Sequence, residues 1–371
     1  MKWNWQQEDW PEFHYDSEKL APLEARFLKE SGLFLGAYKH VADDQKQSLI
    51  IDMISDEAVK TSEIEGEFLN RDSIQSSIRR QFGFQQDLFP AGPAEEGIAE
   101  MMVDLYQNFD QPLTHDMLHR WHEMVTRGER NIRVVGNYRQ HEEPMQVVSG
   151  ALYKPVVHFE APPSDQMQNE MGAFIRWFNN SKSLPALTRA GLTHLYFVCI
   201  HPYEDGNGRI GRALTEKALA EAGGQPTLIA LSQTIEQTRK AYYQHLEANN
   251  KELEITDWLT WFAETILNAQ NYSERLLDFI IAKTRMLDRL KGKLNARQEK
   301  VMLRLFKAGL HGFKGGLSAK NYMTITDALT ATATRDLTDL VKKEALFKTG
   351  QFKGTRYWLN VPSVREAVEQ E

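Results

Sequence analysis

The chain has 371 residues, of which 42% are hydrophobic and 26% charged, and its formal net charge is −7. This composition is ordinary for a soluble globular protein, and the length is enough for two or three domains. One cysteine excludes a disulfide framework, the first ten residues lack the apolar core of a secretory signal, and no apolar run approaches a membrane span. We therefore expect a cytoplasmic protein that has no contact with a membrane.

The N-terminal region is predicted to be helical after an aromatic arm. We expect the rings of that arm to pack on the body of the protein: Trp3, Trp5, Trp10, Phe13 and Tyr15. From Leu49 to Ala58 apolar residues recur at helical spacing. The helix leads into Thr61-Ser62-Glu63-Ile64-Glu65-Gly66, which taken alone is a helix end with glycine at the C′ position.

Two further helices are predicted before residue 130. The first covers about residues 94–109, and Thr114 is a candidate N-cap for the second. The histidines at 115, 119 and 122 lack a further ligand at metal-binding spacing, so exposed or capping histidines are the better interpretation.

A β-hairpin follows. The stretches 146–150 and 154–159 have extended character and flank a glycine turn. A helix is then predicted over 167–178, and apolar residues spaced by three and four from Leu187 to Val198 predict another.

The sequence His201-Pro202-Tyr203-Glu204-Asp205-Gly206-Asn207-Gly208-Arg209-Ile210-Gly211-Arg212 combines groups suited to a metal-bound polyphosphate. Its glycines allow successive backbone N–H groups to converge on an anion at the N-terminus of a helix. Arg209 and Arg212 are three residues apart and share a helix face, and Asp205 offers a hard oxygen for Mg²⁺. His201 is an imidazole that accepts a proton near neutral pH.

A dinucleotide-binding loop is the competing interpretation, because Gly206-x-Gly208-x-x-Gly211 matches that fingerprint. Two features oppose it. Asp205 would repel a pyrophosphate unless a metal intervened, and the stretch before residue 201 has helical periodicity where the fingerprint needs a strand. A loop without catalytic function is the third interpretation.

After the signature the chain returns to helix, predicted over 233–250 with Tyr243 and Asn250 near its end, and from Thr256 to about residue 290. Residues 291–293 are the expected linker.

The C-terminal residues are predicted to form a winged helix. Helices are expected over 297–308, after Ser318 and over 331–343, followed by a hairpin over 346–359. Residues 297–371 contain 13 Lys and Arg against 8 Asp and Glu, whereas the rest of the chain has a net charge of −12. Basic residues on the third helix would face a DNA major groove if the domain binds DNA. The alternative interpretations are that this basic face is solvated or that it docks a protein.

The stretch from His201 to Arg212 resembles the signature of the Fic (Fido) family, His-x-Phe-x-(Asp/Glu)-Gly-Asn-Gly-Arg-x-x-Arg. It departs from that signature at Tyr203, where the family usually has Phe. The resemblance implies a mainly α-helical fold. Its parts would be an N-terminal helical region over 1–110, a Fic core with a β-hairpin flap over 111–290, and a C-terminal winged-helix domain over 295–371.

The resemblance implies transfer of AMP from ATP to a Ser, Thr or Tyr hydroxyl of a target protein, with release of pyrophosphate. His201 would take the proton and Asp205 would hold Mg²⁺. The N–H groups of Gly206 to Gly208 and the side chain of Asn207 would stabilise charge on the α-phosphate. Arg209 and Arg212 would hold the other phosphates, and Ile210 and Gly211 would complete the nucleotide-binding signature.

Further nucleotide-binding and regulatory residues follow from the same resemblance. Thr61, Glu65 and Gly66 resemble the inhibitory motif (Ser/Thr)-x-x-x-Glu-(Gly/Asn), whose glutamate pairs with the second signature arginine, here Arg212. The flap residues Val147, Val148, Ser149 and Gly150 would border the nucleotide. Tyr243 and Asn250 would line the adenine and ribose pocket.

Two other functions remain open from the sequence. One is a DNA-binding regulator whose Fic core only senses a nucleotide. The other is an enzyme that transfers phosphate or another nucleotide, although kinase-like relatives replace the glycine at position 208 with lysine. The target, a homodimer, the release of inhibition and the removal of AMP are also left open.

Overall fold

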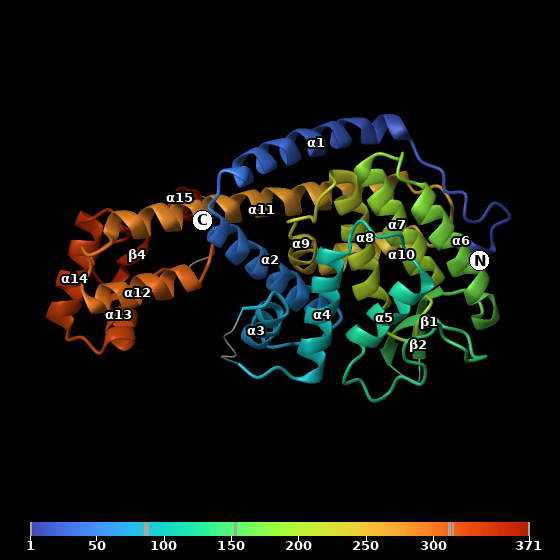
Figure 1. The fold of residues 1–371 in the computed structure, drawn as a ribbon, viewed down its shortest axis with the longest axis horizontal. Helices are drawn as coiled ribbons and strands as arrows, with labels where there is room; N and C mark the ends of the chain where they lie inside the picture. Colours follow the sequence, from blue (N-terminus) through green and yellow to red (C-terminus); the bar gives the residue numbers. More distant parts are fainter. Residues whose placement is uncertain (1, 85–88, 152–153, 311–312, 314, 370–371) are drawn as a thin grey trace. The chain divides into compact units, whose positions relative to one another are not determined.

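A computed structural model describes residues 2–84, 89–151, 154–310, 313 and 315–369, which fold as two compact units. Unit 1 comprises the residues up to 39 and residues 46–272, and unit 2 comprises residues 40–45 and 273–371. The fold is mainly α-helical, as predicted, and the strands within the described ranges form two separate two-stranded hairpins (Figure 1). No helix in these ranges is long and apolar enough to span a bilayer.

Unit 1 contains most of the helices and the first hairpin. Its elements are η1 (Asn4–Gln6), α1 (Ser17–Lys39), α2 (Asp43–Ile64, which starts in unit 2), α3 (Arg71–Gln81), α4 (Pro93–Gln107), α5 (His115–Val125), β1 (Gln146–Ala151), β2 (Lys154–Glu160), η2 (Ser164–Gln166), α6 (Met167–Asn180), α7 (Ala186–Ile200), α8 (Asn207–Gly223), α9 (Leu231–Gln237), α10 (Arg239–Ala248) and the first part of α11 (Thr256–Leu290).

The centre of unit 1 is the pair α7 and α8. Every residue of α7 except Val198 is buried, as expected for a helix that is apolar on all faces. Gly191 lets α11 approach α7, since a Cβ there would lie 2.7 Å from Leu259 Cδ2. The loop over 201–206 joins these two buried helices, so the signature stands on the most rigid part of the unit.

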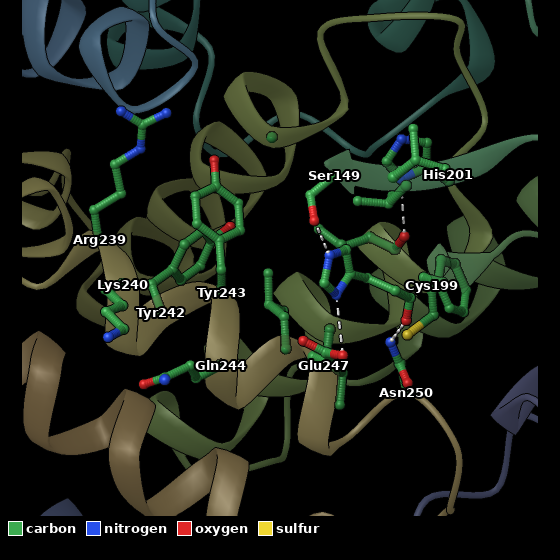
Figure 2. A pocket seen from close by; sticks show the side chains of 18 of the residues that line it. Ser149, Cys199, His201, Arg239, Lys240, Tyr242, Tyr243, Gln244, Glu247 and Asn250 are labelled. Carbon is green, nitrogen blue, oxygen red and sulfur yellow. Dashed lines mark hydrogen bonds and ion pairs between the residues drawn. The ribbon is translucent and has the colours of Figure 1, made fainter. Parts of the chain in front are cut away.

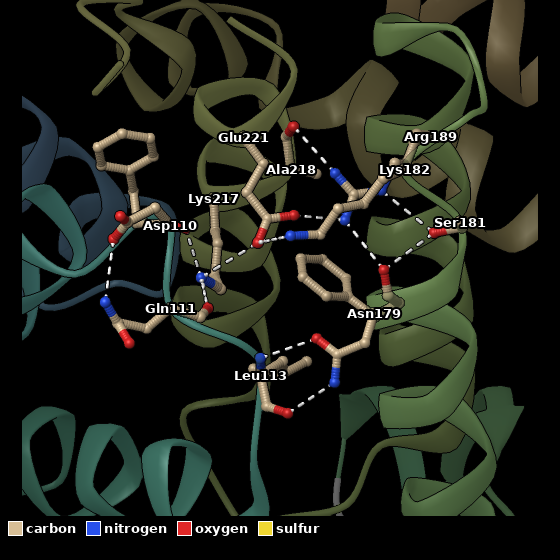
Figure 3. A network of polar contacts seen from close by, with 12 residues as sticks. Asp110, Gln111, Leu113, Asn179, Ser181, Lys182, Arg189, Lys217, Ala218 and Glu221 are labelled. Carbon is tan, nitrogen blue, oxygen red and sulfur yellow. Dashed lines mark hydrogen bonds and ion pairs between the residues drawn. The ribbon is translucent and has the colours of Figure 1, made fainter. Parts of the chain in front are cut away.

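A buried polar network fixes α8 against its neighbours (Figure 3). Glu221 accepts a hydrogen bond from Arg189 Nη2 at 2.6 Å and lies 3.5 Å from Lys217 Nζ. Lys217 donates to the backbone carbonyls of Phe109 and Gln111. Since the buried charges pair with one another and with backbone groups, the network sets the position of α8 without leaving an uncompensated ion.

The hairpin was predicted within one residue at each strand end. β1 and β2 are antiparallel, with Val147 opposite Phe159, Val148 opposite Val157, and a bulge between them. The single helix predicted over 233–250 is wrong, because α9 and α10 are separated at Thr238. The Thr238 hydroxyl donates to the Thr234 carbonyl, the kind of local side-chain bond that competes with helix continuation.

Unit 2 has the element order predicted for the C-terminal residues. Helices α12 (Ala296–Lys307), α13 (Ala319–Thr326) and α14 (Thr330–Lys342) precede the hairpin β3 (Leu346–Thr349) and β4 (Arg356–Leu359), with η3 (Phe352–Gly354) between its strands and α15 (Pro362–Glu369) after it. Asn295 and Ser318 cap α12 and α13 as predicted. The winged-helix assignment stays a prediction.

Candidate functional site

The signature begins at the C-terminus of α7 and ends inside α8. His201 caps α7 in the left-handed conformation, with φ of 51°. A non-glycine residue held there is strained, and such strain gathers at functional positions. Gly206 has φ of 82° and is the N-cap of α8, so α8 starts at Asn207 with its N-terminal N–H groups turned towards the loop. A helix N-terminus of this kind favours an anion.

His201 is set up as a proton acceptor. Its Nδ1 lies 3.3 Å from the Val198 carbonyl, which assigns the proton to Nδ1 and leaves the lone pair on Nε2. Burial lowers the pKa of His201 to about 4, so the ring is neutral at pH 7. Arg139, a fully buried residue that the sequence did not single out, donates from Nε to the His201 carbonyl at 2.9 Å.

Asn207 is hydrogen-bonded within the signature loop. Its Oδ1 accepts from the Tyr203 N–H at 3.0 Å, and its Nδ2 donates to the Tyr203 carbonyl at 2.8 Å. The side chain therefore holds the turn in shape. Its Nδ2 carries a second N–H, so its contact with a phosphate stays a prediction.

The histidine interpretation was wrong for His122. That side chain is completely buried, accepts from the Gly136 N–H at 3.0 Å and stacks on Tyr203 with ring centroids 4.1 Å apart. Burial lowers its pKa to about 4. His122 is thus a neutral ring that packs against the signature loop through Tyr203. The only indication of this in the sequence was the helical spacing of His122 within an apolar face.

Both signature arginines are bound by the last turn of α2 and the residues that follow it. Arg212 donates from Nε to Thr61 Oγ1 at 2.8 Å and from Nη2 to Glu65 Oε1 at 2.7 Å. Arg209 donates from Nη1 to Glu67 Oε2 at 2.8 Å. Both guanidinium groups are almost fully buried, so these carboxylates stand where phosphate oxygens were expected. Glu67 escaped the sequence analysis although it lies only two residues beyond Glu65.

A cavity of about 700 Å³ opens beside the signature (Figure 2). Its walls come from α7, α10, both strands of the hairpin, the signature loop and the start of α8. Glu65, directly after α2, completes the lining. The lining residues are Glu65, Val147, Val148, Ser149, His158, Phe159, Leu195, Val198, Cys199, His201, Gly208, Arg239, Lys240, Tyr242, Tyr243, Gln244, Leu246, Glu247 and Asn250.

Some predicted residues lie outside this lining. The hairpin's Gly150 and the signature's Asp205, Gly206, Arg209 and Arg212 are among them. Ile210 is fully buried in the core, and Gly211 packs against α7, where a Cβ would lie 3.3 Å from Val198. These last two positions therefore act in helix packing in this structure and not in contact with the cavity.

The sequence analysis missed several residues of the cavity wall. His158 and Phe159 of β2 line it together with the predicted residues of β1. Glu247 adds a carboxylate from α10 (Figure 2). His158 Nε2 lies 2.6 Å from Ser149 Oγ, and its Nδ1 lies 3.0 Å from Glu247 Oε1. The signal that could have found Glu247 is its helical spacing from Tyr243 and Asn250.

Asn250 carries an unsatisfied acceptor in this wall. Its Nδ2 donates to the His158 carbonyl at 2.9 Å, whereas Oδ1 is buried and has no hydrogen-bond partner in the described chain. This oxygen is enclosed by protein atoms, so in this structure a ligand in the cavity does not reach it. The apolar walls of the cavity favour a ligand with apolar surface and a few polar groups.

Two family models match the chain. The model described as "Fic/DOC family" matches residues 112–219, and one described as "Domain of unknown function (DUF4172)" matches residues 3–84. A "Probable protein adenylyltransferase" from Aquifex aeolicus is 31% identical over 94 residues, 25% of this chain and 27% of that protein. A "Protein adenylyltransferase Fic" from Nematostella vectensis is 31% identical over 121 residues, 32% of this chain and 26% of that protein.

The chain therefore spans about a quarter of the length of these curated relatives. A solved structure of a Fic family protein from Desulfovibrio desulfuricans shares the fold, with a TM-score of 0.54 and 19% identity over 94% of this chain and 98% of that one.

Proposed function

This chain is a Fic family protein, and from that premise we propose that it transfers AMP from ATP to a Ser, Thr or Tyr hydroxyl of a target protein, releasing pyrophosphate. The observation that carries the proposal is one cavity wall. It brings together a neutral imidazole, His201, and Gly208 in the first turn of α8, and Asn250 lines the same cavity.

The cavity has two chemically different ends. At one end Gly208 lies in the first turn of α8, where backbone N–H groups and the helix dipole suit the phosphates. Elsewhere the apolar side chains and Asn250 suit a base and a sugar. Tyr243 lies nearer Glu65, because its hydroxyl donates to the Ile64 carbonyl at 3.3 Å. We propose that the α-phosphate binds near His201.

In the transfer, the target hydroxyl gives its proton to His201 Nε2 as its oxygen attacks the α-phosphorus. The bond from that phosphorus to the bridging oxygen breaks, and pyrophosphate leaves with the electron pair. The N–H groups at the start of α8 stabilise the growing charge on the phosphate oxygens. Arg139 keeps the His201 backbone in place for the proton transfer.

Asp205 fits a magnesium ion. Its side chain is about half exposed, at 52%, and its contacts are the Gly206 N–H and Arg209 Nη2 at 3.5 Å. No cluster of three or more metal-binding side chains occurs among the described residues, which agrees with the habit of Mg²⁺ to take one or two carboxylates and otherwise water and phosphate oxygens. When bound, the ion would neutralise phosphate charge.

We also propose that Glu65 inhibits the enzyme. Its Oε1 lies so close to Gly208 that a Cβ on that glycine would be 2.1 Å away, so the carboxylate covers the first turn of α8 and repels an anion there. It also occupies Arg212. Removal of AMP from a modified target, with Glu65 orienting a water, is a separate prediction of the same placement.

One experiment separates this function from its rivals. The full chain is incubated with ATP labelled on either the α- or the γ-phosphate, and label on protein is measured. Transfer of α-label alone supports adenylylation, and transfer of γ-label alone would make the protein a kinase. Transfer of neither by the Glu65→Gly variant would favour a regulator that only senses nucleotide.

A further inference from the structure

We propose that the N-terminal arm, residues 3–14, is a positioning element of the nucleotide cavity, in which Trp3 and Asn4 hold the base-and-sugar end in its binding geometry. The inference rests on the proposed function. It gives a role to the start of a segment, residues 3–84, whose family model is described as a domain of unknown function.

Asn4 joins the arm to two walls of the cavity. It is completely buried, and its backbone N–H donates to the Asn250 carbonyl at 3.0 Å. Its side-chain Nδ2 lies 3.1 Å from Cys199 Sγ, on α7 two residues before His201. The Asn250 backbone is thus fixed by Asn4 while its Nδ2 is fixed by His158, so two hydrogen bonds hold this residue in the cavity wall.

The tryptophans of the arm hold the other wall. Trp3 packs edge-on against Phe159, with ring centroids 5.4 Å apart, and Trp5 Nε1 donates to the Glu160 carbonyl at 2.7 Å. Phe159 lines the cavity and Glu160 ends β2. The arm therefore links β2 to the chain that follows α10, at the position where those two walls meet.

The rest of the arm is anchored away from the cavity. Trp10 Nε1 donates to Glu170 Oε2 at 3.0 Å, and its ring packs against Tyr196. His14 pairs with the backbone of residues 253–255, donating to the Leu253 carbonyl at 2.8 Å and accepting from the Ile255 N–H at 2.9 Å. None of these contacts involves a residue that lines the cavity, so they stabilise the arm without shaping the site.

This division predicts a specific kinetic effect. Loss of the Trp3 or Asn4 contacts lets β2 and Asn250 shift relative to each other, while His201 and α8 keep their own supports. Nucleotide binding should weaken by about tenfold, the loss expected for one or two hydrogen bonds or packed contacts. The rate at saturating ATP should change little, because the proton acceptor and the phosphate end are untouched.

The test uses the full chain and measures ATP affinity by calorimetry and the KM and kcat for ATP in transfer. Trp3→Ala and Asn4→Ala should raise Kd and KM by about tenfold with kcat within about twofold of wild type. Trp3→Phe, which keeps a ring against Phe159, should restore most of the affinity. Trp10→Phe is the matched control, since it breaks an arm contact distant from the cavity and should leave Kd unchanged.

Trp5→Phe provides a second measurement if Asn4→Ala does not fold, because it removes only the hydrogen bond to Glu160. Equal Kd values for wild type, Trp3→Ala and Trp5→Phe would overturn the inference. An increase in Kd as large for Trp10→Phe as for Trp3→Ala would also overturn it, since the effect would then be general destabilisation. Because Glu65 is proposed to inhibit the wild type, the deciding protein is the Glu65→Gly variant: if it binds ATP but transfers nothing, the proposed function alone is refuted, whereas if it binds no ATP, both proposals are refuted.

Discussion

Replacing Glu65 by glycine tests the inhibitory contact directly. In the wild type Glu65 Oε1 accepts from Arg212 Nη2 at 2.7 Å and covers Gly208. The variant opens the first turn of α8 to a phosphate and frees one nitrogen of Arg212. Misalignment of a reacting group can cost on the order of 10²-fold in rate, so we expect transfer to rise by about that factor.

The same change should lower stability, and its size follows from burial. The side chain of Arg212 is 1% exposed and that of Glu65 is 28% exposed, so the bond is a largely desolvated, charge-assisted one that contributes about 2 kcal/mol. Arg212 keeps its two bonds to Thr61, which limits the loss. The free energy of unfolding, measured with urea, should therefore fall by about 2 kcal/mol while the rate of transfer rises.

The assay is label on protein from α-labelled ATP, measured over a range of ATP and Mg²⁺ concentrations. Glu63→Gly is the control, because Glu63 lies in the last turn of α2, two residues before Glu65, and pairs with Lys60 and not with the signature. It adds a comparable backbone cost to the helix end without opening Gly208. The reasoning is refuted if Glu65→Gly labels no faster than wild type, or if Glu63→Gly labels equally fast.

Three further outcomes are expected. His201→Ala should keep its ATP affinity by calorimetry but lose about 10²–10⁴ in rate, and the wild-type rate should not decline from protonation of this group until the pH approaches its pKa of about 4. Burial raises the pKa values of Glu57 on α2 and Glu216 on α8, which face each other, so the folded protein keeps a proton that the unfolded chain has already released. Thermal unfolding should therefore show the free energy of unfolding falling as pH rises through neutrality, by up to about 1.4 kcal/mol per pH unit for each retained proton. Glu216→Gln should flatten this slope. Duplex DNA, if residues 295–371 bind it, should dissociate steeply with salt in titrations of the full chain, whereas absence of binding at low ionic strength would favour a protein partner.

The sequence predicted the signature well because its chemistry is dense and local. The loop and the start of α8 lie within twelve consecutive residues, and each has a short-range physical reason. The role of His201 as the base stays a prediction, and the burial that lowers its pKa to about 4 was not predicted. The hairpin and the capping residues of α12 and α13 were predictable for the same reason: a turn or a cap depends on neighbours in sequence.

Contacts between distant residues could not be predicted in the same way. Glu67 and Arg209 are 142 positions apart, and nothing in either segment shows that they meet. The bonds of the Asn207 side chain to Tyr203, four residues before it, were not predicted, because they depend on a turn whose shape only the three-dimensional structure gives. The expected packing of the aromatic arm is confirmed, but the sequence did not show which wall Trp3 contacts.

Two parts of the segment over 3–84 contact opposite ends of the cavity, and we expect them to have opposite effects on nucleotide binding and transfer. We propose that the arm, through its contacts with Asn250 and Phe159, stabilises one end of the cavity and that the carboxylate of Glu65 blocks the end at Gly208. The two contacts share no residue and act on different parts of the nucleotide, so their free energies should add. In the double variant Trp3→Ala with Glu65→Gly, we expect the higher kcat of the second change and the higher KM of the first. If the two effects do not add, the Trp3 and Glu65 contacts are coupled. The segment between them would then change its structure when either contact is lost.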